Sequence, residues 1–318
     1  MQNLRYIFML AVAFSSPSIT SCSKDDNSTN TGGDTIQGKI LYEFGTNTFQ
    51  FDLESGTKQN FFEYNSYSMN GWDVSRDGKL LLSSQIIAGS FDVTKYTLSN
   101  LEDGSLIGEF EYRPLGMERD NRGLLSPDNS LIAIKPTADQ GIIIVNTSGE
   151  VLHELNSVNG EPIKQRENVV WLPGNALVFT FNDFVLRTDP PYTTITPIRQ
   201  MDFTEWGDLH ANPDGTKLSM RIDKHIYLMD IDGQNLTQVT ESSTVHYERE
   251  AVFSPDGKYL LVGTDWTPRS NSKGVWSLKI IPADGRKYRV DEEDPNVIPI
   301  IPKGSEVIEK CSDIMLWR

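Results

Sequence analysis

The chain has 318 residues, of which 38% are hydrophobic, and it carries 29 Lys and Arg against 44 Asp and Glu, a formal net charge of −15. This acidity argues against nucleic acid and anionic lipid headgroups as partners. Beyond the first twenty residues, no stretch is long or apolar enough to form a transmembrane helix.

The first 21 residues have the pattern of a secretory signal. Arg5 supplies a positive charge, residues 6–14 form a short apolar run, and small residues precede Cys22. The apolar run is too short to span a bilayer. A cysteine in this position resembles the lipobox of bacterial lipoproteins, which implies a signal peptide over residues 1–21 and an outer-membrane lipid anchor on Cys22. The alternative is an ordinary signal peptidase site beside an incidental cysteine.

Residues 22–37 read as a flexible tether, because they consist almost entirely of small and polar residues. Its first part, residues 23–26, resembles the acidic export signal of surface lipoproteins in Bacteroidota-type cells. That resemblance implies display on the cell surface, and a periplasm-facing anchor is the alternative. If Cys22 carries lipid, Cys311 has no disulfide partner within the chain, so the domain over residues 38–318 has to be stabilised by its own core.

A five-residue phrase recurs along this domain, and each copy predicts a tight turn. Proline sets φ, aspartate caps its own turn, and the following Gly or Asn accepts a positive φ. The copies, 40 to 51 residues apart, are Ser75–Lys79, Ser126–Ser130, Leu172–Ala176, Asn212–Thr216 and Ser254–Lys258. A period of this length with several short strands per unit is typical of propeller blades.

Each turn is preceded by one short apolar run and followed by three, which predicts four strands per blade. The first strands are expected at Trp72–Val74, Gly123–Leu125, Val169–Leu172, Leu209–Ala211 and Ala251–Phe253. In the last of these five blades the fourth strand is expected at residues 287–290, and residues 291–310 are expected to cross to the end of the chain.

The two ends of the domain supply a sixth blade. Residues 40–62 provide three strands without a first one, and Ile314–Trp317 has the composition of the missing strand. Because closing the ring removes exposed sheet edges, we predict that Ile314–Trp317 pairs with the strand over Ile40–Phe44. The predicted fold is all-β: a six-bladed β-propeller with four-stranded antiparallel blades, closed by the N- and C-terminal strands.

The turn phrase followed by an apolar strand resembles the WD40-like repeat of TolB-type six-bladed propellers. The copies at Ser126 and Ser254 match well, the copy at Leu172 is degenerate, and the first copy has Arg76 where proline is usual. The resemblance covers the whole domain and implies its fold. It leaves the activity open, because propellers of this type serve binding, assembly and catalysis alike.

Polar side chains gather just before the turn phrases, where the first strand of each blade should run beside the central channel. The functional interpretation is a ligand site at the channel mouth, with tryptophan and tyrosine as stacking faces and arginine as a partner for carboxylates. The alternative is a wet channel that polar residues merely fill. The candidates are Trp72, Asp73, Arg122, Arg166, Glu167, Trp206, Asp208, His210, His246, Tyr247, Glu248 and Glu250.

Two functions follow from this site. The favoured one is a monomeric, non-enzymatic recognition or scaffold module of the cell envelope, without a cofactor, that binds a glycan or another envelope protein. The other is a lyase or hydrolase acting on oligosaccharides, which a resemblance to propeller lyases of acidic oligosaccharides keeps open. His210 and His246, with carboxylates nearby, could hold a divalent metal ion, or two carboxylates could act as acid and base. The two histidines belong to different blades and lack compact ligand spacing.

Overall fold

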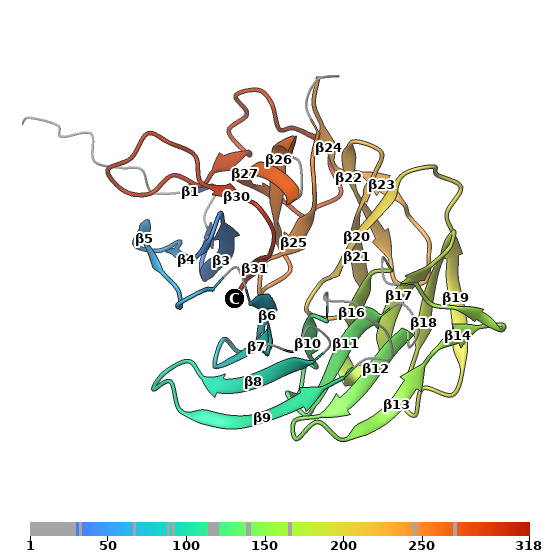
Figure 1. The fold of residues 1–318 in the computed structure, drawn as a ribbon. Coiled ribbons are helices and arrows are strands. Elements are labelled where there is room, and N and C mark those ends of the chain that lie inside the picture. Colours follow the sequence, from blue (N-terminus) through green and yellow to red (C-terminus); the bar gives the residue numbers. More distant parts are fainter. Residues whose placement is uncertain are drawn as a thin grey trace, which may run out of the picture.

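The computed structural model describes residues 30–31, 34–65, 68–87, 90, 93–113, 121–137, 141–164, 167–243, 247–269 and 272–318. Within these ranges, six antiparallel sheets surround a common axis, which confirms the six-bladed propeller (Figure 1). The predicted signal peptide, Cys22 and most of the tether lie outside the described residues. In the described part of the chain, no helix has the length and hydrophobicity needed to cross a membrane.

The blades are numbered here along the chain. Blade 1 comprises β3 (Lys39–Phe44), β4 (Asn47–Asp52), β5 (Thr57–Asn60) and the C-terminal β31 (Met315–Trp317). Blade 2 comprises β6 (Met69–Val74), β7 (Leu80–Ile86), β8 (Thr94–Asn100) and β9 (Leu106–Tyr112). Blade 3 comprises β10 (Gly123–Leu125), β11 (Leu131–Thr137), β12 (Gly141–Asn146) and β13 (Val151–Leu155).

The second half of the ring is built in the same way. Blade 4 comprises β16 (Val169–Trp171), β17 (Leu177–Phe181), β18 (Phe184–Thr188) and β19 (Ile195–Gln200). Blade 5 comprises β20 (Trp206–Ala211), β21 (Lys217–Ile222), β22 (His225–Asp230) and β23 (Thr237–Gln238). Blade 6 comprises β25 (Ala251–Phe253), β26 (Tyr259–Arg269), β27 (Ser272–Pro282), β29 (Ile298–Pro299) and β30 (Lys310–Cys311).

Short elements complete the description. They are β1 (Asn30–Thr31), β2 (Asp34–Thr35), β14 (Ser157–Val158), β15 (Glu161–Pro162), β24 (Thr240–Glu241), β28 (Tyr288–Arg289) and a single 3-10 turn over Pro173–Asn175. The 3-10 turn coincides with the degenerate copy of the turn phrase.

The turn phrase builds the same hydrogen-bonded turn wherever it is intact. In the second copy the hydroxyl of Ser126 donates to Asp128 at 2.7 Å and accepts the amide of Leu131 at 2.9 Å. Asn129 takes a φ of 63°, as the pattern requires of a Gly or Asn at that place. The phrase therefore fixes the end of each inner strand and the start of the next one, which sets the repeat.

The ring closes as predicted. β31 pairs with β3 in the register Ile40↔Trp317, Leu41↔Leu316 and Tyr42↔Met315. Lys39 and Arg318 exchange two backbone hydrogen bonds at 2.6 and 2.9 Å beyond that ladder. β31 is thereby the innermost strand of blade 1, beside the inner strands β6, β10, β16, β20 and β25 of the other blades (Figure 1).

The prediction for the outer strand of blade 6 is wrong. The strand expected at residues 287–290 forms β28, which pairs in parallel with β24 instead of β27. Tyr288 and Val290 are buried between blades 5 and 6, and that burial places this segment beside blade 5. The outer strand is β29, inside the segment expected to be a plain crossover, where Ile298 faces Ile280.

The hydrophobic core lies between the blades. The described residues form six clusters of buried side chains, and each combines residues of two neighbouring blades. Trp276, Tyr42 and Trp317, for example, are buried together between blades 6 and 1. Because each sheet packs on both of its faces, its apolar residues are used between blades, and the polar residues of the inner strands are left for the axis.

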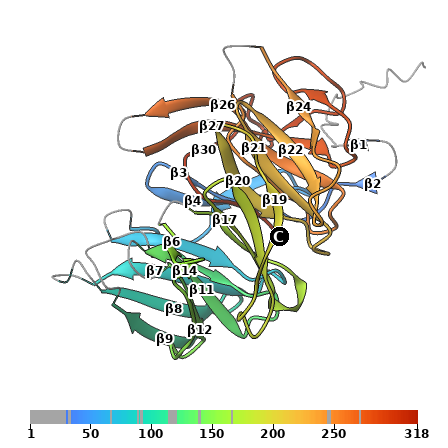
Figure 2. The same ribbon diagram turned by 90° about the vertical axis from the view of Figure 1, so that its right-hand side faces the viewer.

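The two faces of the disc differ. All inner strands run toward the face that carries the turn phrases, and Arg318 and Gly38 lie on this turn face as well. The opposite face is called the mouth face here. In Figure 2 the β26–β27 hairpin projects from one side of the disc, whereas β1, β2 and the C-terminal end lie toward the other.

Candidate functional site

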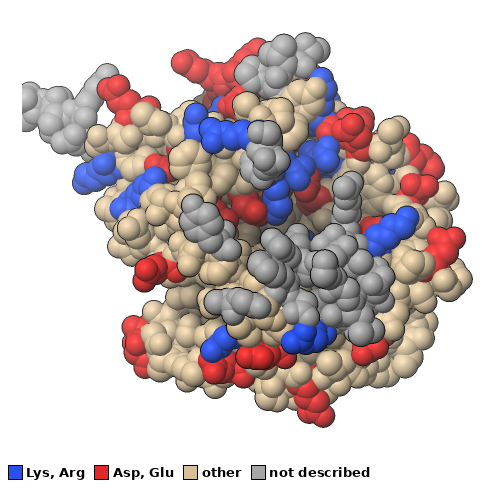
Figure 3. All heavy atoms as spheres, in the orientation of Figure 1, with Lys and Arg blue, Asp and Glu red and all other residues tan. Residues whose placement is uncertain are grey.

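A central cavity of about 540 Å³ follows the axis of the ring and receives residues from all six blades. Each blade contributes at least one apolar residue to its wall, and these residues include Val74, Leu125, Val170, Ala211, Val252 and Leu316. Toward the mouth face the wall is polar, with Asp73, Arg122, Asn168, Asp208, His210, Arg249, Glu250 and Lys273. Acidic and basic side chains lie close together near the middle of the face in Figure 3.

Two guanidinium groups close the cavity at the turn face. Arg76 reaches from blade 2 across the axis and donates to the carbonyl oxygens of Trp171 at 2.8 Å and Pro213 at 2.9 Å. Arg318 donates to the carbonyl of Val74 at 2.8 Å and lies 3.4 Å from Asp73. The arginine that departs from the repeat therefore spans the turn end of the cavity and forms its floor.

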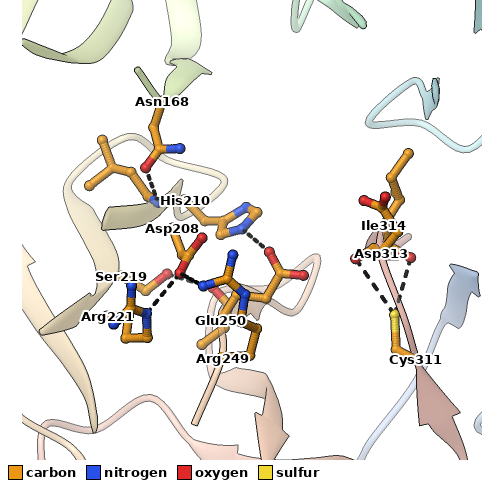
Figure 4. A network of polar contacts seen from close by, with 12 residues as sticks. Asn168, Asp208, His210, Ser219, Arg221, Arg249, Glu250, Cys311, Asp313 and Ile314 are labelled. Atoms are coloured by element: carbon orange, nitrogen blue, oxygen red, sulfur yellow. Dashed lines mark hydrogen bonds and ion pairs between the residues drawn. The ribbon is translucent and has the colours of Figure 1, made fainter. Parts of the chain in front are cut away.

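A β-bulge in blade 5 aims Asp208 at its partners. Gly207 pairs with Arg221 and His210 with Ser219, so the register shifts between them, and Asp208 adopts a φ of 53°. One carboxylate oxygen of Asp208 accepts from Arg221 Nε and Arg249 Nη1, each at 2.9 Å (Figure 4). Two guanidinium groups hold this carboxylate in place.

A second polar pair, His210 and Glu250, lies on the cavity wall near Asp208. His210 Nε2 lies 3.4 Å from an oxygen of Glu250, and both side chains are partly exposed (Figure 4). Asn168 uses its side-chain oxygen to accept the amide of Leu209 at 3.3 Å, which ties blade 4 to blade 5 at the same level. Three neighbouring blades thus present donors and acceptors to one space.

The structure brings some of the predicted site residues together. Asp73, Arg122, Asp208, His210 and Glu250 line the cavity. Two further candidates, at positions 166 and 246, lie outside the described residues, so the proposed pairing of two histidines around a metal ion is not described. Elsewhere in the described chain, no group of three or more His, Cys, Asp or Glu side chains is placed to hold a metal ion.

The three predicted stacking faces are not on the cavity wall. Trp72 is 1% exposed, packs against Phe61 and Phe62, and donates its indole N–H to a buried carboxylate. Trp206 packs into the cluster between blades 4 and 5. The ring of Tyr247 contacts the indole of Trp266 edge to face, with ring centroids 6.0 Å apart. Side chains alternate across a strand, so neighbours in sequence point into different interfaces.

Two predicted carboxylates also lie away from the cavity. Glu167 accepts from Thr180 and from the amide of Asn182 within blade 4. Glu248 is 1% exposed and accepts from His225 at 2.6 Å and from a threonine hydroxyl at 3.0 Å. Burial raises the pKa of Glu248, and the bond to His225 opposes that shift. Glu167 therefore stabilises blade 4, and Glu248 joins the segment before β25 to blade 5.

Several lining residues were not predicted. Lys273 comes from the long β26–β27 hairpin and forms an ion pair with Asp313. Lys135 lies on β11 of blade 3, and Arg318 is the last residue of the chain. The departure at Arg76 was visible in the repeat, but nothing in the sequence indicated where its side chain would reach.

A buried carboxyl lies beside this mouth, at the closing seam. Glu43 on β3 is 4% exposed and accepts the indole N–H of Trp72. Burial, with the nearby charge of Asp313, raises the pKa of Glu43 to about 7. Arg122 and Lys273 oppose this shift from the cavity side.

Comparisons with known proteins agree with the fold. No protein-family model and no curated protein matches the chain. The structure is similar to a protein of Agrobacterium tumefaciens assigned as TolB, with a TM-score of 0.54 and 14% identity over 80% of this chain and 88% of that one. It is also similar to TolB from Acinetobacter baumannii, with a TM-score of 0.55 and 16% identity over 79% of this chain and 65% of that one.

An oligogalacturonate lyase from Vibrio parahaemolyticus is more distant, with a TM-score of 0.47 and 18% identity over 74% of both chains. At that distance the likeness says nothing about chemistry in the cavity. The domain has the fold of a TolB-like six-bladed β-propeller. At these identities the TolB structures, too, show the fold alone.

Proposed function

We propose that the protein is a non-enzymatic binding module of the bacterial cell envelope, and that its central cavity takes up the end of a glycan chain from the mouth face. The observation that carries this proposal is the cavity itself, closed at one end and polar at the other. Its volume of about 540 Å³ falls within the range of small-ligand sites, roughly 300–1,000 Å³.

The dimensions favour a chain end over a folded partner. A folded envelope protein could contact the mouth face but could not enter a pocket of this size. The polar wall offers carboxylate, amide, imidazole and guanidinium groups, which suit the hydroxyl groups of a sugar as acceptors and donors. An envelope protein docking on the mouth face is the other partner that the repeat pattern allows, and no described contact favours it.

Catalysis receives no specific support from the cavity. One carboxylate oxygen of Asp208 is occupied by hydrogen bonds from two arginines. Among the described lining residues His210 is the one imidazole, and its partner is Glu250 at 3.4 Å. A lyase or hydrolase function needs an acid and a base positioned on one bond, and no second pair is present in the described wall.

The location we propose is the outer membrane, with a lipid on Cys22 and the domain displayed on the cell surface. The domain begins at Ile36–Gly38, which lie on the turn face beside Arg318. The preceding 14 residues from Cys22 would span roughly 20 Å as a flexible chain. An anchor at this end leaves the mouth face directed away from the membrane and open to ligand.

Proteinase treatment of intact cells tests this location. Surface display predicts that the domain is degraded while a periplasmic control protein stays intact. Protection of the domain until the outer membrane is permeabilised would contradict surface display, and would leave the periplasm-facing anchor.

A glycan array tests the binding function. The purified domain should bind at least one family of oligosaccharides. Binding should be lost in His210→Trp, which narrows the cavity at a side chain that is already partly exposed there. Val307→Trp introduces the same side chain at a position that is 67% exposed, and should bind like the wild type. The proposal would be contradicted if the domain bound no sugar on the array. It would also be contradicted if His210→Trp left binding intact while both variants melted normally.

A further inference from the structure

The charge of the cavity is opposite to that of the protein. The described lining residues include six cations and three carboxylates, although the whole chain has a formal net charge of −15. The cations are Arg76, Arg122, Lys135, Arg249, Lys273 and Arg318, and the carboxylates are Asp73, Asp208 and Glu250. A cleft lined by one sign of charge between low-dielectric walls focuses its field and attracts the opposite charge.

The carboxylates of the wall are already engaged. Asp208 accepts from Arg249 and Arg221, and Glu250 faces His210. Asp73 accepts the amide of Leu125 at 2.8 Å and lies beside the guanidinium at the cavity floor. These acids are held in place by their own partners, so they do not compete strongly for the remaining cations.

Arg122 has no such partner among the described residues. None of the described carboxylates forms an ion pair with it, and its Nε is buried without a hydrogen-bond partner. Its stem lies against Gly71, where an added Cβ would come within 2.9 Å of the Arg122 Cγ. The glycine therefore gives the arginine its place at the mouth end of β10.

The lack of well-exposed aromatic side chains on the described cavity wall also favours a charged ligand. Neutral sugars are commonly bound through exposed aromatic faces. Here the three predicted ones are used elsewhere in the fold, and the aromatic residues that border the cavity, Trp171, Phe253 and Trp276, are at most 6% exposed. Affinity in this cavity then has to depend on hydrogen bonds and charge. A planar guanidinium can bind a carboxylate through two parallel hydrogen bonds, which supplies both strength and orientation.

We infer that the glycan is acidic: a chain of uronic acids whose terminal carboxylate binds Arg122, in a cavity whose described lining carries more cations than carboxylates. This inference rests on the proposed function and adds the chemical class of its ligand.

Calorimetric titration with a matched pair of sugars tests it. The probes are a uronic acid tetrasaccharide and the same tetrasaccharide with its carboxyl groups reduced to alcohols. The acidic sugar should bind at least tenfold more tightly, and added salt should weaken its binding. Arg122→Gln should lose roughly tenfold or more in affinity, as expected for a hydrogen bond to a charged group. Arg286→Gln removes an equal charge from a side chain that is 74% exposed, and should bind like the wild type.

A second variant distinguishes a specific loss of binding from a general effect on folding. Arg122→Lys keeps the positive charge but cannot donate two parallel hydrogen bonds to a carboxylate, so it should weaken binding of the acidic sugar and leave the melting temperature close to wild type. Equal binding of the acidic and reduced sugars would overturn the charge inference and leave the proposed function standing. Binding of a glutamate pentapeptide but of neither sugar would overturn the proposed function as well. Full affinity in Arg122→Gln would overturn the role of Arg122.

Discussion

A chain that lacks Ser312–Arg318 should fail to fold stably. The deletion removes the innermost strand of blade 1, whose apolar side chains are all buried. Met315 and Trp317 belong to the cluster between blades 6 and 1, and Ile314 and Leu316 to the cluster between blades 1 and 2. Two of the six interfaces between blades therefore lose their inner part at once.

The size of the effect follows from that burial. Each large apolar side chain contributes about 1.5–3 kcal/mol when it is fully buried. Four of them together match the whole free energy of unfolding of an ordinary domain, about 5–15 kcal/mol. The measurement is thermal unfolding followed by circular dichroism. We expect a melt that is lost or shifted far downward, and partial recovery when a peptide of residues 312–318 is added. An unchanged melt would show that the ring does not depend on this strand.

The second large effect concerns pH. Glu43 has an ordinary pKa of 4.5, and burial beside Asp313 raises it to about 7 in the folded protein. The folded state thus holds a proton that the unfolded chain releases. Its contribution to stability is complete below about pH 4.5 and is lost as the pH rises through 7. The difference between the two values corresponds to about 3 kcal/mol at most.

Urea unfolding at pH 5, 7 and 9 measures this dependence. The wild type should lose stability over that range, and Glu43→Gln should lose less, because glutamine still accepts the indole N–H of Trp72 without ionising. Glu248 is also buried with a raised pKa and contributes a slope of the same sign in both proteins, so their difference isolates Glu43. Glu102→Gln, at an exposed turn, is the control. Identical pH slopes in the wild type and Glu43→Gln would contradict this account.

The fold was predictable because the sequence signals that determine it are local. Each turn phrase carries its own hydrogen bonds, as between Ser126 and Asp128, and so marks the strand ends without reference to the rest of the chain. The closing strand was predictable because residues 40–62 supply three strands of a blade and lack the first one. The outer strand of blade 6 was not, because the apolar pattern around Tyr288 indicates a strand but not its partner, and that choice depends on burial against blade 5.

The location of the cavity could be predicted from the sequence, but only some of its lining residues could. The ring brings the inner strands together, so Asp208 and His210 reach the cavity as expected. Trp72 does not, because its side chain points into the interface between blades 1 and 2. Arg76 and Lys273 reach the cavity by long side chains from a turn and a hairpin, and no spacing rule predicts such a reach.

The proposed binding depends on one arrangement, a basic pocket at the centre of an acidic disc that accepts a carboxylate at Arg122. A crystal structure of the protein with the uronic acid tetrasaccharide tests this most directly. We predict that the sugar enters from the mouth face, with one carboxylate within hydrogen-bond distance of the Arg122 guanidinium and with Arg76 still closing the floor. A sugar bound on the outer surface of the blades, with the cavity holding only water, would contradict it.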